Sequence, residues 1–159
     1  MTKDQFVAKF KATRAVFLST LNGLQEQEAS VASGPAGDWV TIKDLIGHIA
    51  SWEREVLIAD EMIKRGEESY LGKLNFDEFN RAQSEHRRNW SLAQVMAELD
   101  LNYEALLMAW DEYEDDDGPF GPATWQPEGP DSLYWLISHQ VEHGSDIARR
   151  RGLQVVFPQ

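Results

Sequence analysis

Apolar residues recur at helical spacing along most of the chain, and polar segments separate the runs. The pattern predicts helices over residues 2–24, 41–64, 75–88, 91–112 and from 131 or 132 to 151. Four of these begin with a residue whose side chain can cap a helix, followed three residues later by a partner that can return the hydrogen bond. These pairs are Thr2 with Gln5, Thr41 with Asp44, Asn75 with Glu78, and Ser91 with Gln94.

The intervening segments contain the residues that break helices. Residues 28–38 are rich in Ala, Ser and Gly and include Pro35, and residues 118–130 contain four prolines. No strand pattern, internal repeat or linker interrupts the helices. The sequence therefore predicts an all-α fold over residues 1–159 as a single domain. We expect a four-helix bundle, with one extra short helix at residues 75–88 in the connection between the second and third long helices.

The charge and composition of the chain limit the kinds of partner that it can bind. The 15 basic and 27 acidic residues give a formal charge of −12, which repels nucleic-acid phosphates and anionic membrane surfaces. With no cysteine, thiolate ligands and a cysteine nucleophile are excluded, so thiol chemistry would need an external thiol. The N-terminal residues do not resemble a signal peptide, and no apolar run is long enough to span a membrane, so we expect a cytoplasmic protein.

The main chemical candidate is a pair of histidines near the end of the chain. His139 and His143 are four residues apart in a predicted helix, so both imidazoles lie on one face. Leu136 and Ile147 share that stripe, which turns the pair towards neighbouring helices. His48 is the candidate for a third ligand, because it lies on the apolar stripe of residues 41–64.

Each histidine taken alone is consistent with a packed core residue. Three imidazoles on core-facing stripes would carry a desolvation cost unless something binds them, and a shared metal ion would satisfy all three. Such a ligand set suits zinc, nickel or iron and leaves positions open for water or substrate. The pair lacks the His-Glu arrangement of a zincin protease.

Other side chains are candidates for supporting roles. Trp52 lies one turn from His48 and is a pocket candidate. Trp135, with Phe120 and Trp125, either lines a pocket mouth or simply covers the core. Glu53 and Glu55 fall off the apolar stripe and are expected to be solvated, although Glu55 is close enough to its edge to orient a ligand. Glu142 and Asp146 can also orient ligands. They are equally consistent with exposed charges on the polar face.

Residues 39–53, 75–80 and 139–147 together resemble the DinB superfamily, which includes YfiT-like proteins and the N-terminal domain of mycothiol-dependent maleylpyruvate isomerase. The resemblance runs in order over almost the whole chain. It implies a four-helix bundle whose long connection joins helices two and three, and a divalent metal bound at the positions of His48, His139 and His143. A related branch shares the central segment and includes proteins that protect DNA from a genotoxin, but the three histidines favour the metal-binding branch.

Characterised relatives are thiol-dependent transferases or isomerases that use mycothiol, bacillithiol or glutathione, while many members have no established reaction. The resemblance thus implies a metal-dependent enzyme of small-molecule thiol transfer or detoxification, with a thiol and an electrophile as partners. A metal-bound water would instead give a hydrolase. A third alternative is a non-catalytic bundle that binds a stress-related ligand or dimerises. A homodimer is plausible for the family, and no general acid or base is assigned.

Overall fold

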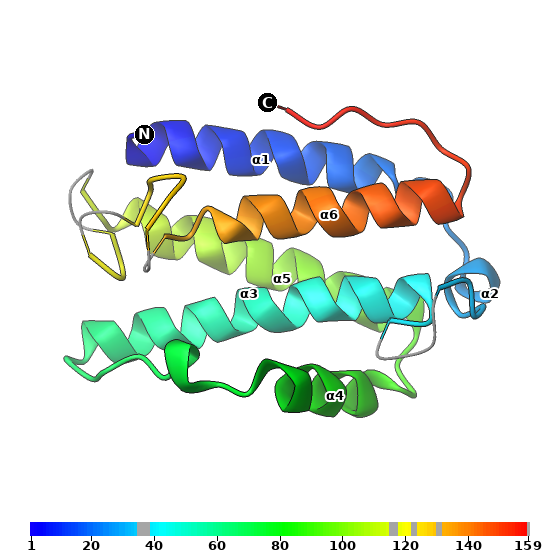
Figure 1. Ribbon diagram of the computed structural model, residues 1–159, viewed down its shortest axis with the longest axis horizontal. Helices are drawn as coiled ribbons and strands as arrows, with labels where there is room; N and C mark the ends of the chain where they lie inside the picture. Colours follow the sequence, from blue (N-terminus) through cyan, green and yellow to red (C-terminus); the bar gives the residue numbers. More distant parts are fainter. Residues whose placement is uncertain (35–38, 115–117, 122–123, 130–131, 159) are drawn as a thin grey trace. The chain divides into compact units, whose positions relative to one another are not determined.

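A computed structural model describes residues 1–34, 39–114, 118–121, 124–129 and 132–158. All regular structure in these ranges is helical, which confirms the all-α prediction (Figure 1). The elements are α1 (Lys3–Ser19), α2 (Glu26–Ala29), α3 (Ile42–Lys64), the 3₁₀ turn η1 (Leu71–Lys73), α4 (Phe76–Arg87), α5 (Leu92–Asp111) and α6 (Trp135–Arg150). No helix in this part of the chain combines the length and the apolar character needed to cross a membrane.

The predicted caps start four of the helices. Thr2 and Thr41 each form a reciprocal capping box, with Gln5 and Asp44 respectively. Asn75 accepts the backbone N–H of Glu78 at the start of α4. Ser91 and Gln94 exchange side chain to backbone hydrogen bonds of 2.8 and 3.2 Å at the start of α5. These local bonds satisfy backbone N–H groups that the first helical turn leaves open.

Two helix boundaries differ from the prediction. α1 ends at Ser19 rather than near Leu24, because the chain turns there while Leu21 and Leu24 remain buried after the turn. α6 begins at Trp135, since the Ser132 hydroxyl accepts the N–H of Tyr134 in an irregular segment. The predicted Asp131 cap lies outside the described residues, as do Pro35, Pro122 and Pro130. The sequence pattern also missed α2, which is only four residues long.

The chain divides into two compact units. The first unit comprises Met1–Asn22 and Leu107–Gln159, and the second comprises Gly23–Leu106. The division falls inside α5, between Leu106 and Leu107. That residues 1–159 form a single domain stays a prediction.

The first unit has an aromatic interior beside the α1 and α6 pair. α1 packs along α6, and the segment after α6 turns back along it (Figure 1). The rings of Phe6 and Phe10 meet the edge of Trp110 at centroid distances of 5.2 and 5.1 Å. Trp125 packs on Phe6 at 5.3 Å, and all four rings are buried. Edge-to-face contacts of this kind add to the burial of large apolar surfaces.

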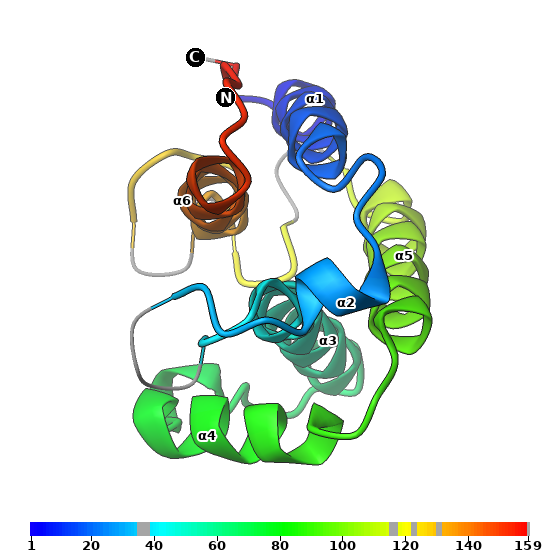
Figure 2. The same ribbon diagram turned by 90° about the vertical axis from the view of Figure 1, so that its right-hand side faces the viewer.

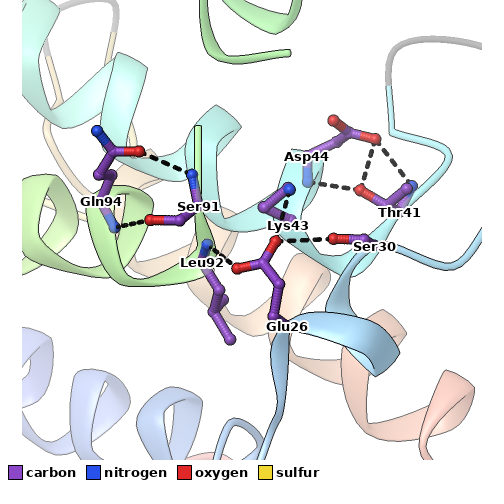
Figure 3. Close-up of polar contacts among 8 residues, drawn as sticks. All are labelled: Glu26, Ser30, Thr41, Lys43, Asp44, Ser91, Leu92 and Gln94. Carbon is purple, nitrogen blue, oxygen red and sulfur yellow. Dashed lines mark hydrogen bonds and ion pairs between the residues drawn. The ribbon is translucent and has the colours of Figure 1, made fainter. Parts of the chain in front are cut away.

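The second unit is built around α3, and α4 packs against it (Figure 2). Arg87 forms a two-point ion pair with Glu98, with N···O distances of 2.6 and 2.7 Å. Asn102 donates to the carbonyl of Ala50 at 2.8 Å. Figure 3 shows how Glu26 connects three segments of this unit, since its carboxylate accepts from Lys43, Ser30 and the backbone N–H of Leu92. Polar contacts therefore join the helices of this unit.

Candidate metal centre

His139 and His143 lie side by side on α6. Their ring centroids are 4.5 Å apart and the ring planes are inclined at 81°. His143 is buried and His139 is half-buried, while Leu136 and Ile147 on the same helix are buried. A separation of this size is compatible with two imidazoles on one ion, because metal–nitrogen bonds are about 2.0–2.1 Å long. The two imidazoles thus lie together on one face of α6 in the first unit, as their spacing predicts.

The surroundings of His143 favour its neutral form. Burial lowers its pKa, and the positive charge of Arg150 acts in the same direction. The carboxylates of Glu142 and Asp146 act in the opposite direction, but the net shift is downward. A neutral imidazole is the form that binds a metal ion, because a protonated ring has no free lone pair.

Gly144 allows close packing next to this histidine. A Cβ atom at position 144 would lie 2.6 Å from Cζ of Phe157 and 3.0 Å from Cδ2 of Phe17. Only a residue without a side chain lets both rings approach the backbone of α6 at this point. The segment after α6 is further held by Arg151, which donates to the carbonyls of Thr20 and Asn22. Packing on this side fixes the backbone that carries His143.

His48 lies on α3, in the second unit. Its side chain is buried, and the ring of Trp39 packs on it with centroids 4.6 Å apart and a tilt of 51°. Leu45 and Val56, on the same predicted stripe, are also buried. The structure thus places His48 on an inward face, as the sequence predicted.

The family model of the DinB superfamily matches residues 9–147 of this chain, a span that contains all three histidines. The chain belongs to the DinB superfamily. Its fold is similar to that of a crystal structure titled an uncharacterised protein from Escherichia coli UTI89. The two share 15% sequence identity, the TM-score is 0.72, and the match covers 96% of each chain. A search of curated proteins gives no match.

In this DinB-superfamily chain the acidic residues chosen from the sequence differ in burial and in their contacts. Glu55 is buried and accepts a hydrogen bond from the hydroxyl of Tyr70. Glu53 is only 1% exposed, so the expectation that both carboxylates are solvated is wrong. Asp146 pairs with Arg149 and Arg150, and Glu142 is exposed. Roles for Glu55, Glu142 and Asp146 in orienting ligands stay predictions.

The two tryptophans chosen from the sequence lie in different surroundings. The indole N–H of Trp52 donates to Asn80 at 3.0 Å, and its ring packs against Phe76 and Phe79 of α4. Trp135 is 36% exposed and meets the ring of His139 at 5.8 Å. Their assignment to a pocket stays a prediction.

Sequence reasoning missed the aromatic neighbour of His48. Trp39 comes two residues before the cap of α3, and it folds back over the first turns of that helix. The residue expected to pack on the first turn is the one directly before the cap, here Val40, so this rule does not predict the contact between Trp39 and His48.

Proposed function

We propose that this protein is a divalent-metal-dependent enzyme of small-molecule thiol transfer or detoxification. The observation that carries the proposal is the His139–His143 pair, whose rings lie 4.5 Å apart in a chain of the DinB superfamily. We further propose that α1, α3, α5 and α6 form a four-helix bundle and that α4 is the extra helix in the α3–α5 connection.

In this proposal His48 joins the pair as the third ligand. Each of the three histidines would offer one imidazole nitrogen to the ion. Burial supports the assignment, because it lowers the pKa of His143 and so favours the neutral imidazole that binds a metal ion. An all-imidazole set suits zinc, nickel or iron. When bound, such an ion supplies Lewis acidity and lowers the pKa of a thiol or water that it holds.

The nucleophile in this proposal is a low-molecular-weight thiol. The chain contains no cysteine, so none of its own residues can supply a thiolate. The sulfur would form a bond to an electrophilic carbon of a second small molecule. The leaving group would depart from that carbon with the bonding electron pair, and the thiol proton would pass to the leaving group or to solvent. The net charge of −12 supports small molecules rather than nucleic acid as partners. A cytoplasmic location and a homodimer remain part of the proposal.

Elemental analysis of purified wild-type protein beside His143→Ala tests the metal site. We expect about one equivalent of metal in the wild type and a loss of most of it in the variant. His86→Ala is the matched control, because His86 is exposed on α4 and packs on Trp90. His139→Ala and His48→Ala should behave like His143→Ala, and circular dichroism verifies that each variant is folded. Equal metal content in wild type and His143→Ala, or none in either after reconstitution, would contradict the proposal.

A cobalt-substituted sample then separates thiol transfer from hydrolysis. We expect the visible spectrum of the cobalt protein to change on addition of a thiol such as glutathione, with no such change for its S-methyl derivative. A spectrum that responds only to pH would favour the hydrolase alternative. A large fall in melting temperature with chelator, without activity on any electrophile tested, would indicate a structural metal.

A further inference from the structure

A polar hollow lies between the start of α3 and the end of α4, within the second unit. It has a volume of about 310 Å³ and is lined by Ser30, Thr41, Lys43, Asp44, Ser84 and Arg88. A narrower pocket of about 10 Å³ shares Lys43, Asp44 and Ser84 with it and extends to Trp39 and His48. The larger volume is at the lower end of the range for small-molecule sites. The smaller one has room for a group about the size of one water molecule.

Basic residues outnumber acidic ones among the described residues that line these hollows, whereas the chain as a whole is acidic. Lys43, Arg87 and Arg88 line them, and Asp44 is the acidic residue among the described lining residues. The carboxylate of Asp44 is engaged at the start of α3, where it accepts from the backbone and hydroxyl of Thr41 at 2.9 and 2.7 Å (Figure 3). Among the described residues that line the larger hollow, two are basic and one is acidic, in a chain whose net charge is −12.

The basic groups keep hydrogen-bond capacity for a ligand. Lys43 pairs with Glu26 at 2.9 Å, which uses one of the three N–H donors of its ammonium group. Arg88 pairs with Glu85 through Nη2, one of the nitrogens of a guanidinium that has five N–H donors. Glu26 and Glu85 are not among the described residues that line either hollow. Each glutamate therefore contacts its basic partner from outside the hollow.

We propose that this hollow binds the oxyanion group, a carboxylate or a phosphate, of a small molecule. Lys43 and Arg88 supply the positive charge and the N–H donors that would bind the oxyanion. We further infer that the other end of the bound molecule extends towards His48, and this part of the inference rests on the proposed function. It assigns a substrate class to the protein: small acids or phosphate esters that carry a slender reactive group.

A titration with defined anions tests the site. We would follow the backbone amide signals of isotope-labelled protein by NMR while adding succinate, glycerol phosphate or neutral succinamide at constant ionic strength. We expect saturable shifts at Thr41, Lys43 and Ser84 with one or both anions and none with succinamide. The anion that binds more tightly distinguishes a carboxylate from a phosphate as the natural group.

Two variants of one ion pair separate charge from structure. Lys43→Gln removes the cation and the pair, whereas Glu26→Gln breaks the same pair but keeps the cation. We expect Lys43→Gln to weaken anion binding about tenfold or more, because a hydrogen bond to a charged group contributes that much. Glu26→Gln should bind as tightly as the wild type or more so. Equal weakening in both variants, or no weakening in either, would overturn the inference.

The proposed metal site can fail independently of this one. His143→Ala, which removes a proposed ligand in the first unit, should leave the anion shifts at Thr41 and Ser84 unchanged. If the anion effects vanish in His143→Ala and persist in Lys43→Gln, the anion binds at the metal and the hollow is not its site. It is also possible to find no metal in the wild type or in any variant while the Lys43-dependent shifts remain. That result would support the anion site and contradict the metal-dependent function.

Discussion

Both units have a mainly apolar interior, but the side-chain contacts that accompany it differ between them. Phe6, Phe10, Trp110 and Trp125 fill the first unit with buried rings that meet at 5.1–6.2 Å. Charged and amide side chains join the helices of the second unit, as in the Arg87–Glu98 ion pair. Ring packing tolerates little change of shape, whereas polar contacts depend on retaining both partners.

This difference matches the role that we propose for each unit. The first unit holds the histidine pair on α6, where an aromatic interior and the Phe157 contact at Gly144 fix the backbone. A chelate benefits from such fixed geometry, because ligand positions must be accurate for metal binding. The second unit contains the hollow lined by Lys43 and Arg88, and the narrower pocket that shares Lys43 with it extends to His48. The comparison can be tested by removing a ring from one unit and a charge from the other.

The largest loss of stability is expected when a buried ring is removed from the first unit. Trp110→Ala should lower the free energy of unfolding by about 3–5 kcal/mol, because it removes a ring that is 1% exposed and leaves a cavity beside Phe6 and Phe10. Urea denaturation followed by circular dichroism measures this. Met108→Ala on the same helix is the control, since Met108 is 73% exposed and its loss should change stability by less than about 0.5 kcal/mol. A similar small change in both variants would mean that the rings contribute little.

A smaller loss of stability is expected when an ion pair is broken in the second unit. Glu98→Gln should cost about 1.5–3 kcal/mol, because it replaces a charge-assisted, two-point contact to the buried Arg87. Glu85→Gln is the matched control, because the Glu85–Arg88 pair is exposed and should contribute less than about 1 kcal/mol. The same denaturation experiment compares them. If Glu98→Gln is no more costly than Glu85→Gln, the ion pair does not hold the second unit together.

How much of the fold the sequence predicts depends on whether the signal is local. α3 was predicted over residues 41–64 and observed as Ile42–Lys64, because its capping box and the Gly66 stop are both local signals. The start of α6 was placed too early, since its first turn has no side-chain cap and follows an irregular segment. α2 was missed because four residues are too few for a helical period to appear.

The candidate site, like the fold, was predictable only where the signal is local in the sequence. The i, i+4 spacing of His139 and His143 was enough to predict their contact on α6. Spacing could not reveal that Arg87 meets Glu98 or that the hollow unites Ser30 with Arg88, because these residues come from different elements. Glu53 and Glu55 were misjudged because α3 buries more than one stripe, with over half of its 23 residues buried. A single apolar stripe underestimates burial for a helix packed on several sides.

The smallest effect concerns acid stability in the second unit. The hydrogen bond from Lys43 and the backbone N–H of Leu92 lower the pKa of Glu26 from 4.5 to about 2. A carboxyl with a lowered pKa in the folded state stabilises the protein above pH 4.5, and this contribution is lost as the pH falls towards 2. Glu26→Gln should therefore show a shallower loss of melting temperature over this interval than the wild type. Lys43→Gln should show an intermediate slope, because the Leu92 N–H remains to stabilise the carboxylate. Identical slopes in all three proteins would show that the contacts at Glu26 do not contribute to acid unfolding.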